Sequence, residues 1–244
     1  MRTYAIGDIH GHLDKLEALH ALIDADRRVC GDAEAPVVHI GDLVDRGPDS
    51  RGVIDFLLAA RDRCAPWVVI KGNHDRMFRS FMANPDHHDI GLRSDLHWID
   101  PRLGGGETLA SYGVTGAGER RLFDLHDAAL SAVPLAHIDY IDTLPSLYLR
   151  GTCLFVHAGI RPGVDLHDQN ENDLLWIRNG FLEDTRDHGV LVVHGHTPVD
   201  VVTHYGNRLN IDTGAGYGRP LAAVVIEGNA VWELTPQGRV AIAA

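Results

Sequence analysis

The chain has 244 residues, of which 45% are hydrophobic, and this length and composition suit one large globular domain with a substantial core. Its formal net charge of -12 argues against a general nucleic-acid or anionic-membrane surface, because both of these need a basic field. The three cysteines are scattered and odd in number, which excludes a disulfide framework and a thiolate metal site.

The amino terminus predicts neither export nor membrane attachment. It reads MRTYAIGD and lacks the apolar core of a secretory signal. No apolar run approaches the roughly 18 residues needed to cross a bilayer. Together with the unpaired cysteines, this favours a cytoplasmic protein. We find no linker, repeat or low-complexity tract, and we predict a single domain over residues 1–244. The sequence makes no prediction of the oligomeric state.

Five short apolar runs end abruptly in Gly, Asp, Asn or His, and their β-branched and aromatic content predicts buried strands. They are residues 4–8 (YAIGD), 37–42 (VVHIGD), 67–75 (WVVIKGNHD), 154–159 (LFVHAG) and 190–196 (VLVVHGH). Helical periodicity separates the first three runs, in residues 12–28 and in residues 49–63, where Asp49 or Ser50 is the expected N-cap. This alternation predicts βαβ units and a largely parallel sheet.

The rest of the chain shows a different pattern of predicted secondary structure. Residues 77–149 are more helical and are interrupted by three glycines at 104–106. Beyond His196, short strand-like segments follow one another without helices between them. We expect these segments to form a second, mixed or antiparallel sheet that packs on the first.

Potential metal ligands gather at the ends of the predicted strands, where ligands bind in open α/β sheets. The set consists of Asp8, His10, Asp42, Asn73, His74, His157 and His196. Singly, such an aspartate is most often a turn or cap residue, and such a histidine a core residue. Jointly, a set of oxygen and nitrogen donors without a thiolate favours two divalent cations such as manganese, iron or zinc. Two such ions need a bridging ligand, and Asp42 lies between the other ligand groups.

Five motifs in a fixed order carry a family resemblance: GDIHGH, GDLVDRG, GNHD, the HAG of VHAG, and GHT. The chain closely resembles the calcineurin-like metallophosphoesterases, and within them the phosphoprotein phosphatase branch. That branch includes bacterial and phage serine/threonine phosphatases and symmetric diadenosine tetraphosphatases. The segments GGGETLASYG, HAGIRPG, DLLWIR and NIDTGAGYG also look like parts of the bacterial members, so the resemblance covers nearly the whole chain. It implies a four-layer α/β/β/α sandwich of two mixed β-sheets.

The resemblance also implies how the metal ligands are shared. Asp8 and His10 would hold the first metal, Asp42 would bridge, and the second metal would take Asn73, His157 and His196. Related families place one more histidine on the first metal, at the position that Pro198 occupies here. We therefore expect this metal to keep more water. His194 and His39 are expected to be structural.

The implied reaction is hydrolysis of a phosphate monoester by in-line attack of a metal-bridging hydroxide. Arg46 and Arg178 would bind the phosphate, because planar guanidinium groups suit its oxygens. His74 would protonate the leaving alkoxide, held by Asp45 as the family pattern implies, with Asp75 as the rival in sequence. Tyr217 is a candidate substrate contact.

The substrate is less narrowly predicted. A serine/threonine protein phosphatase is the first reading, and a symmetric diadenosine tetraphosphatase or a nucleotide-end pyrophosphohydrolase is the alternative. A dinucleotide would need aromatic surfaces and further cations, for which Trp98, Arg93 and Arg102 are candidates. We expect a phosphorylated protein or a phosphorylated small molecule or nucleotide as partner, no membrane and no stable nucleic-acid complex. Two divalent metal ions are the expected cofactors, with Mn²⁺ preferred over Fe or Zn.

A scaffold that has lost catalysis is disfavoured, since every motif position for metal, phosphate and proton donor is filled. A nuclease of the same superfamily is disfavoured by the acidic net charge and by Pro198.

Overall fold

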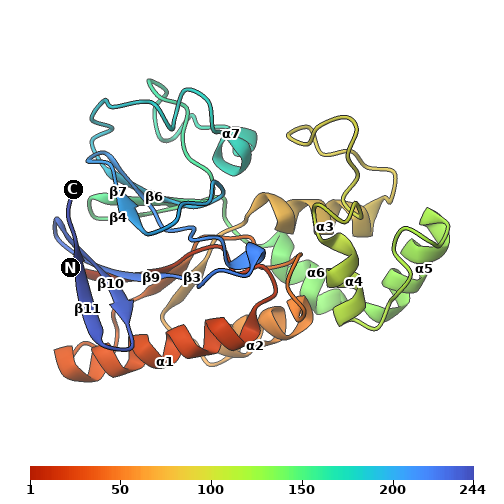
Figure 1. The fold of residues 1–244 in the computed structure, drawn as a ribbon, viewed down its shortest axis with the longest axis horizontal. Coiled ribbons are helices and arrows are strands. Elements are labelled where there is room, and N and C mark those ends of the chain that lie inside the picture. Colours follow the sequence, from red (N-terminus) through yellow and green to blue (C-terminus); the bar gives the residue numbers. More distant parts are fainter.

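Two β-sheets face each other in the computed structural model, which describes residues 1–244 (Figure 1). The first sheet contains β1 (Arg2–Ile6), β2 (Val37–His39), β3 (Trp67–Val69), β9 (Ala223–Glu227), β10 (Ala230–Thr235) and β11 (Gly238–Ile242). The second contains β4 (Leu147–Arg150), β5 (Cys153–Val156), β6 (Leu191–His194), β7 (Thr203–His204) and β8 (Arg208–Asn210). The strand orders are β11-β10-β9-β1-β2-β3 and β4-β5-β6-β8-β7.

Helices cover the outer faces of both sheets, and more of them lie on the first. They are α1 (Leu13–Cys30), α2 (Ser50–Asp62), α3 (Asn73–Ala83), α4 (Gly105–Ser111), α5 (Leu122–Ala132), α6 (Leu135–Asp142) and α7 (Glu171–Trp176), with a 3-10 turn, η1, at Ala215–Tyr217. In Figure 1, α1 and α2 lie beneath the first sheet, α7 lies with long loops over the second, and α3 to α6 form a lobe at one end. The α2 helix begins as expected, because the Asp49 side chain accepts a hydrogen bond from Gly52 N.

Three apolar clusters correspond to the three interfaces between four layers. Tyr4 and Ile6 of β1 belong to the cluster shared with the helices, whereas Ala5 between them belongs to the cluster between the sheets. A third cluster, which includes Leu154 and Val156 of β5, packs the second sheet against α7 and the loops beside it. Because side chains alternate between the faces of a strand, β1 is buried on both sides. The expected four-layer sandwich of two mixed sheets is confirmed.

The distribution of strands differs from the expectation in two respects. The five apolar runs do not share one parallel sheet, since the first three supply β1, β2 and β3 and the last two supply β5 and β6 of the other sheet. The strands beyond His196 do not form a sheet of their own. β7 and β8 complete the second sheet, and β9 pairs antiparallel with β1, so β9 to β11 extend the first. Hydrophobic periodicity identifies a strand but not its neighbour, which is why pairing was assigned wrongly.

None of the helices combines the length and the hydropathy that crossing a membrane requires.

A pair of buried histidines joins α1 to the first sheet. His20 Nε2 lies 3.0 Å from His39 Nε2, His39 Nδ1 lies 3.2 Å from the carbonyl oxygen of Val68, and the His20 ring stacks 3.9 Å from the Trp67 ring. The carbonyl must accept from His39, so His39 Nε2 accepts from His20 and both rings are neutral. Burial lowers the pKa of His39 to about 4 and lowers the pKa of His20 further.

This pair predicts a loss of stability in acid. The folded-state pKa of each histidine is below the unfolded value, so its contribution is complete above about pH 6.5 and is lost as the pH falls toward 4. We expect the free energy of unfolding to fall by about 2 kcal/mol per histidine between pH 7 and pH 5. The variant His20→Gln keeps a donor for His39 and should lose about 2 kcal/mol less over this range. Urea unfolding in the presence of a chelator measures both, and an unchanged pH dependence in the variant would contradict the assignment.

Candidate active site

Six parallel strands bring their carboxyl ends to one edge of the molecule. β1, β2 and β3 are parallel in the first sheet, and β5, β6 and β8 are parallel in the second. Each predicted metal ligand lies just beyond one of these strands and is almost fully buried: Asp8 and His10 after β1, Asp42 after β2, Asn73 after β3, His157 after β5 and His196 after β6. The fold therefore collects residues that are up to 188 positions apart, as the hydrogen bond from His196 N to Asp8 Oδ2 shows.

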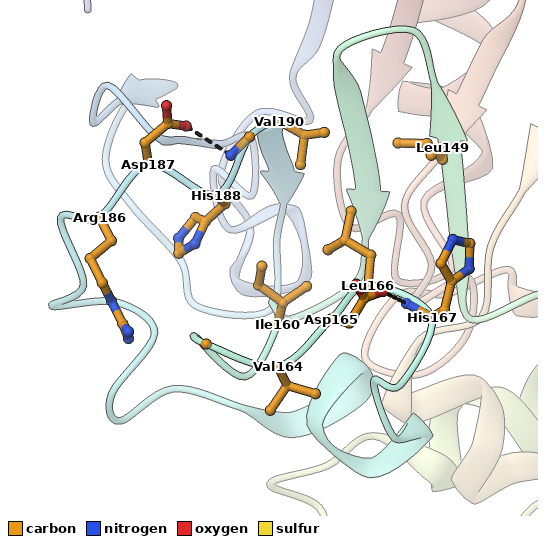
Figure 2. A pocket seen from close by; sticks show the side chains of 12 residues that line it. Leu149, Ile160, Val164, Asp165, Leu166, His167, Arg186, Asp187, His188 and Val190 are labelled. Atoms are coloured by element: carbon orange, nitrogen blue, oxygen red, sulfur yellow. Dashed lines mark hydrogen bonds between the residues drawn. The ribbon is translucent and has the colours of Figure 1, made fainter.

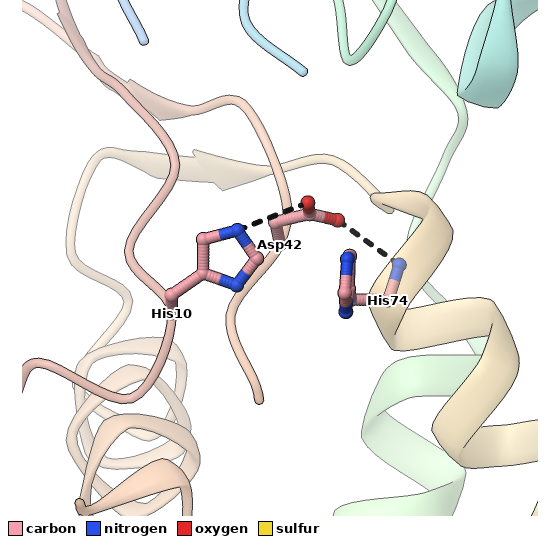
Figure 3. A group of neighbouring side chains, drawn as sticks. All are labelled: His10, Asp42 and His74. Atoms are coloured by element: carbon pink, nitrogen blue, oxygen red, sulfur yellow. Dashed lines mark hydrogen bonds and ion pairs between the residues drawn. The ribbon is translucent and has the colours of Figure 1, made fainter. Parts of the chain in front are cut away.

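Asp42 lies at the centre of this set, between two groups of imidazoles. His10 Nε2 is 3.4 Å from Asp42 Oδ2, and His157 Nε2 is 3.3 Å from Asp42 Oδ1. The donor atoms of His10, Asp42 and His74 lie within 4.8 Å of one another, and so do those of Asp42, His157 and His196. Figure 3 shows the first of these groups, in which His74 N also donates to Asp42 Oδ1 at 3.0 Å. A carboxylate shared by two such groups is placed as a bridging ligand would be.

Backbone carbonyls fix the tautomers of two of these imidazoles. His10 Nδ1 lies 2.9 Å from Val44 O, and His157 Nδ1 lies 3.0 Å from Ile40 O. Burial lowers the pKa of both histidines, so each ring is neutral, donates from Nδ1 and keeps a lone pair on Nε2. His157 Nε2 then faces Asn73 Oδ1 at 2.8 Å, which places two acceptors in contact. A cation between them would turn this repulsion into coordination.

Two further buried atoms have no hydrogen-bond partner in the protein, Asp8 Oδ1 and His196 Nε2. Burial and the charges of Asp212 and Asp42 raise the pKa of Asp8 well above its usual value, and burial raises that of Asp212 to about 6. Three buried carboxylates in one place need positive charge nearby to stay ionised. Unpartnered acceptors, facing acceptors and excess carboxylates all fit two divalent cations held by oxygen and nitrogen donors.

Backbone strain marks the same residues. Of the six non-glycine residues with positive φ, five are His10 (46°), Asp42 (49°), Asp45 (73°), Arg46 (67°) and His196 (64°). Each such conformation costs about 1–3 kcal/mol and persists only where its surroundings enforce it. Close packing contributes to this. A Cβ at Gly195 would lie 2.0 Å from Asp8 Oδ1, so the residue before His196 must be glycine for the two loops to meet.

Asp45 and His74 form a buried pair beside the ligand cluster. His74 Nδ1 lies 2.6 Å from Asp45 Oδ2, and Asp45 is fully buried. Asp75, its rival in sequence, is turned away and accepts hydrogen bonds from Gly72 N at 2.7 Å and Leu43 N at 2.8 Å. It therefore caps α3 and does not orient His74.

Two residues that the sequence did not assign to the site hold Asp45 in place. Thr108 Oγ1 donates to Asp45 Oδ1 at 2.7 Å, and Trp98 Nε1 donates to Asp45 Oδ2 at 2.8 Å. Trp98 was considered only as a surface for a nucleotide base, but it is 3% exposed and packs against Phe78 and Phe81. No local pattern reveals this role, because Trp98 is 53 residues from Asp45.

The two predicted phosphate ligands line one cleft of about 220 Å³, together with Asp42, Asn73, His74, His196 and Tyr217. Arg46 lies across two imidazoles, with Nη1 at 2.6 Å from His10 Nε2 and Nη2 at 3.1 Å from His74 Nε2. The Tyr217 ring, 59% exposed, lies 4.7 Å from the Arg46 guanidinium. Arg178 stands at the rim, where its Nε donates to Thr197 Oγ1 at 3.3 Å. Arg102 pairs with neighbouring Asp100 and does not line the cleft.

Size alone does not identify this cleft. A cavity of about 500 Å³ lies between the loops around residues 160–167 and 186–190 (Figure 2). Its carboxylates accept backbone hydrogen bonds, Asp165 from His167 N and Asp187 from Gly189 N. It contains no predicted site residue and no group of potential metal ligands. The smaller cleft is distinguished by its chemistry.

Comparison with known proteins agrees with this picture. A family model described as calcineurin-like phosphoesterase matches residues 1–221. The asymmetrical bis(5'-nucleosyl)-tetraphosphatase PrpE of Geobacillus thermodenitrificans is 26% identical over an alignment of 255 positions, gaps included, which covers 92% of this chain and 90% of that protein. The symmetrical bis(5'-nucleosyl)-tetraphosphatase of Cellvibrio japonicus is 41% identical over 75 residues, which cover 31% of this chain and 25% of that protein. The solved structure of a cold-active protein tyrosine phosphatase has a similar fold, with a TM-score of 0.64 at 18% identity, and the match covers 98% of this chain and 78% of that one.

The central position of Asp42 predicts that one substitution affects both metal sites. We expect Asp42→Asn to weaken the binding of two divalent metal ions by more than about 100-fold, because changes to outer partners of a ligand alone cost about 10–100-fold. Elemental analysis after equilibrium dialysis measures the bound metal. Asp200→Asn is the matched control, since its side chain is 99% exposed. Loss of a single ion from Asp42→Asn would contradict a bridging role.

Proposed function

Because the chain belongs to the calcineurin-like phosphoesterase family, which consists of metal-dependent phosphoesterases, we propose that the cleft around Asp42 is its active site. The observation that supports this most is the arrangement around one carboxylate. Asp42 belongs to both potential metal groups, and the Asp45–His74 pair and Arg46 lie directly beside it. This arrangement supports a site in which metal binding, phosphate binding and proton transfer take place within one cleft.

We propose that Asp8, His10 and Asp42 hold the first metal, and that Asp42, Asn73, His157 and His196 hold the second. When bound, two divalent cations supply Lewis acidity, which stabilises charge on phosphoryl oxygens and makes a hydroxide available near neutral pH. Mn²⁺ is the proposed metal, with Fe and Zn as alternatives, because the donors are carboxylate, amide and imidazole groups.

Arg46 and Arg178 are proposed to bind the phosphate. Both line the cleft, and their guanidinium groups present pairs of N–H donors that match phosphate oxygens. Arg46 now contacts His10 and His74, so it must exchange these imidazoles for the phosphate. Tyr217 covers the outer face of the Arg46 guanidinium and thereby limits where this side chain can move.

His74 is proposed to protonate the leaving oxygen. Its Nδ1 proton is held by Asp45, and its Nε2 accepts from Arg46 in this structure, so Nε2 is the nitrogen that would carry the proton to be transferred once Arg46 has moved to the phosphate. The buried carboxylate stabilises the doubly protonated ring and keeps its orientation. Thr108 and Trp98 act on the reaction through Asp45, because each donates to one of its oxygens.

A nucleoside polyphosphate is the substrate that we favour. The relatives that match most of the chain are named bis(5'-nucleosyl)-tetraphosphatases. The cleft is also lined by Leu92, Leu96 and Trp176, which offer apolar surface for a base, and by Arg93, whose exposed guanidinium pairs with Asp95.

A serine/threonine phosphoprotein, the first expectation from the sequence, is the second candidate. The cleft volume of about 220 Å³ supports it, because this space suits a phosphoryl group with a small substituent better than a whole dinucleotide. The deciding experiment compares kcat/KM for diadenosine tetraphosphate and for a phosphoserine peptide in the presence of Mn²⁺. We expect a preference of at least about 100-fold for the dinucleotide, and the opposite preference would favour the phosphoprotein.

The proposed role of His74 predicts a dependence on the leaving group. We expect His74→Ala to lower kcat by about 10²–10⁴ on phosphoserine, whose alkoxide needs a proton, and by far less on p-nitrophenyl phosphate. Steady-state kinetics on both substrates measures this difference. His167→Ala replaces an exposed histidine that does not line the cleft and is the matched control. Equal losses on the two substrates would remove His74 as the acid.

The hydrogen bond from Trp98 to Asp45 predicts a smaller loss of kcat with the same dependence on the leaving group. Trp98→Phe keeps an aromatic ring against Phe78 and Phe81 but loses the Nε1 donor. We expect kcat on phosphoserine to fall by about tenfold, which corresponds to about 1.4 kcal/mol, with little change on p-nitrophenyl phosphate. Trp232→Phe, in β10, controls for the loss of an indole elsewhere. An equal loss on both substrates would indicate a general packing defect.

A further inference from the structure

One wall of the cleft is a long segment without regular structure. Residues 84–104 connect α3 to α4 and contain no helix or strand; they form the yellow loop in Figure 1. Leu92, Arg93, Leu96 and Leu103 of this segment line the cleft, together with Trp176 at the end of α7. An irregular segment of this length keeps a defined shape only if specific contacts hold it.

The strongest of these contacts is a buried ion pair. Arg76 of α3 donates to both oxygens of Asp89, from Nε at 2.7 Å and from Nη2 at 2.7 Å, and Asp89 is 3% exposed. The same Nη2 donates to Asn172 Oδ1 of α7 at 3.1 Å. A two-pronged guanidinium–carboxylate pair fixes orientation as well as distance. Arg76 thus joins three separate elements: α3, the wall and α7.

Asp89 connects the ion pair to residues that line the cleft. It accepts hydrogen bonds from Gly91 N at 2.9 Å through its side chain and from Leu92 N at 2.9 Å through its carbonyl, which builds the turn that positions Leu92. Gly91 packs on the indole of Trp176 so closely that a Cβ there would lie 2.4 Å from Trp176 Cγ. Trp176 in turn lies edge-on to His196, at 5.7 Å between ring centroids. The ion pair is therefore linked by direct contacts to the face of the cleft.

We propose that Arg76, through Asp89, is a positioning residue that fixes residues 84–104 against Trp176, and that the wall so formed receives the substrate's leaving group. The leucines and the indole select a flat apolar group, such as a nucleobase, over a short polar alkyl group, because flat aromatic rings stack on such surfaces. The proposal rests on the proposed function, since the cleft must hydrolyse phosphate esters for a leaving group to exist. Arg76 lies one helical turn beyond Asn73, so the helix that carries Asn73 and His74 also positions residues 84–104.

The test breaks the ion pair and compares leaving groups. Asp89→Asn removes the charge and keeps the shape. Asp142→Asn is the matched control, because it removes another arginine–aspartate pair of the same helix outside the cleft, in which Arg79 Nε donates to both oxygens of Asp142 at 2.7 and 2.8 Å. Initial rates with Mn²⁺ are measured for diadenosine tetraphosphate, p-nitrophenyl phosphate and β-glycerophosphate. We expect Asp89→Asn to raise KM at least about tenfold for the first two substrates and to leave kcat and KM for β-glycerophosphate within about twofold.

One further variant and the control make the test more specific. Arg76→Lys keeps the charge but loses the two-pronged geometry, and it should raise KM in the same direction by a smaller factor. Asp142→Asn should change none of the three substrates. Equal changes for all three substrates in Asp89→Asn, or a fall in kcat accompanied by loss of bound metal, would show a merely structural role and overturn the proposal.

Hydrogen exchange separates failure of this proposal from failure of the proposed function. If the unmodified protein hydrolyses none of the three esters, the proposed function fails, and exchange of residues 86–99 still tests the wall. We expect AMP to slow exchange of these residues in the unmodified protein, and we expect Asp89→Asn to speed their exchange and abolish the effect of AMP. Unchanged exchange in Asp89→Asn, or protection by AMP of some other segment only, would overturn the proposal.

Discussion

A carboxylate buried among four imidazoles has no stable place in a protein interior unless positive charge accompanies it, and Asp42 is in this position. Asp8 and Asp212 add two more buried carboxylates at the same edge of the sheets. Arg46 lies nearby but already contacts two of the imidazoles. Contacts from the surrounding backbone keep these groups together. The neutral imidazoles of His10 and His157 point their free nitrogens inward because backbone carbonyls hold the opposite nitrogens.

The two parallel strand triplets make this concentration of polar groups possible. Parallel strands end at a common edge, so six short loops from distant parts of the sequence converge there. Three of the loops have positive φ at candidate ligand positions, His10, Asp42 and His196, and the strands that precede these loops are buried on both faces. A stable sandwich thus supports a site whose local conformations are unfavourable by themselves.

The helical lobe beside Asp42 orients several side chains of the cleft. The α3 helix begins with Asn73 and His74, and its next turn carries Arg76, which holds the wall of residues 84–104. That same segment carries Trp98, which donates to Asp45. One segment therefore shapes the outer cleft and also supports the residue that orients His74. The proposed proton donor, His74, and the proposed leaving-group surface are structurally connected, although they belong to different parts of the chain.

The sequence by itself determined the elements and the donors: the strands that end in GD, GNHD, HAG and GHT, the α1 and α2 helices, and the residues able to bind metal and phosphate. These follow from local patterns, because burial period, turn residues and side-chain chemistry are properties of short segments. Only the tertiary structure decided which strands pair, that β9 lies beside β1, and that Trp98, Thr108 and Arg76 act near the site. These contacts join residues that lie 13 or more positions apart in the chain, and a long-range contact leaves no periodic trace in either of its partners.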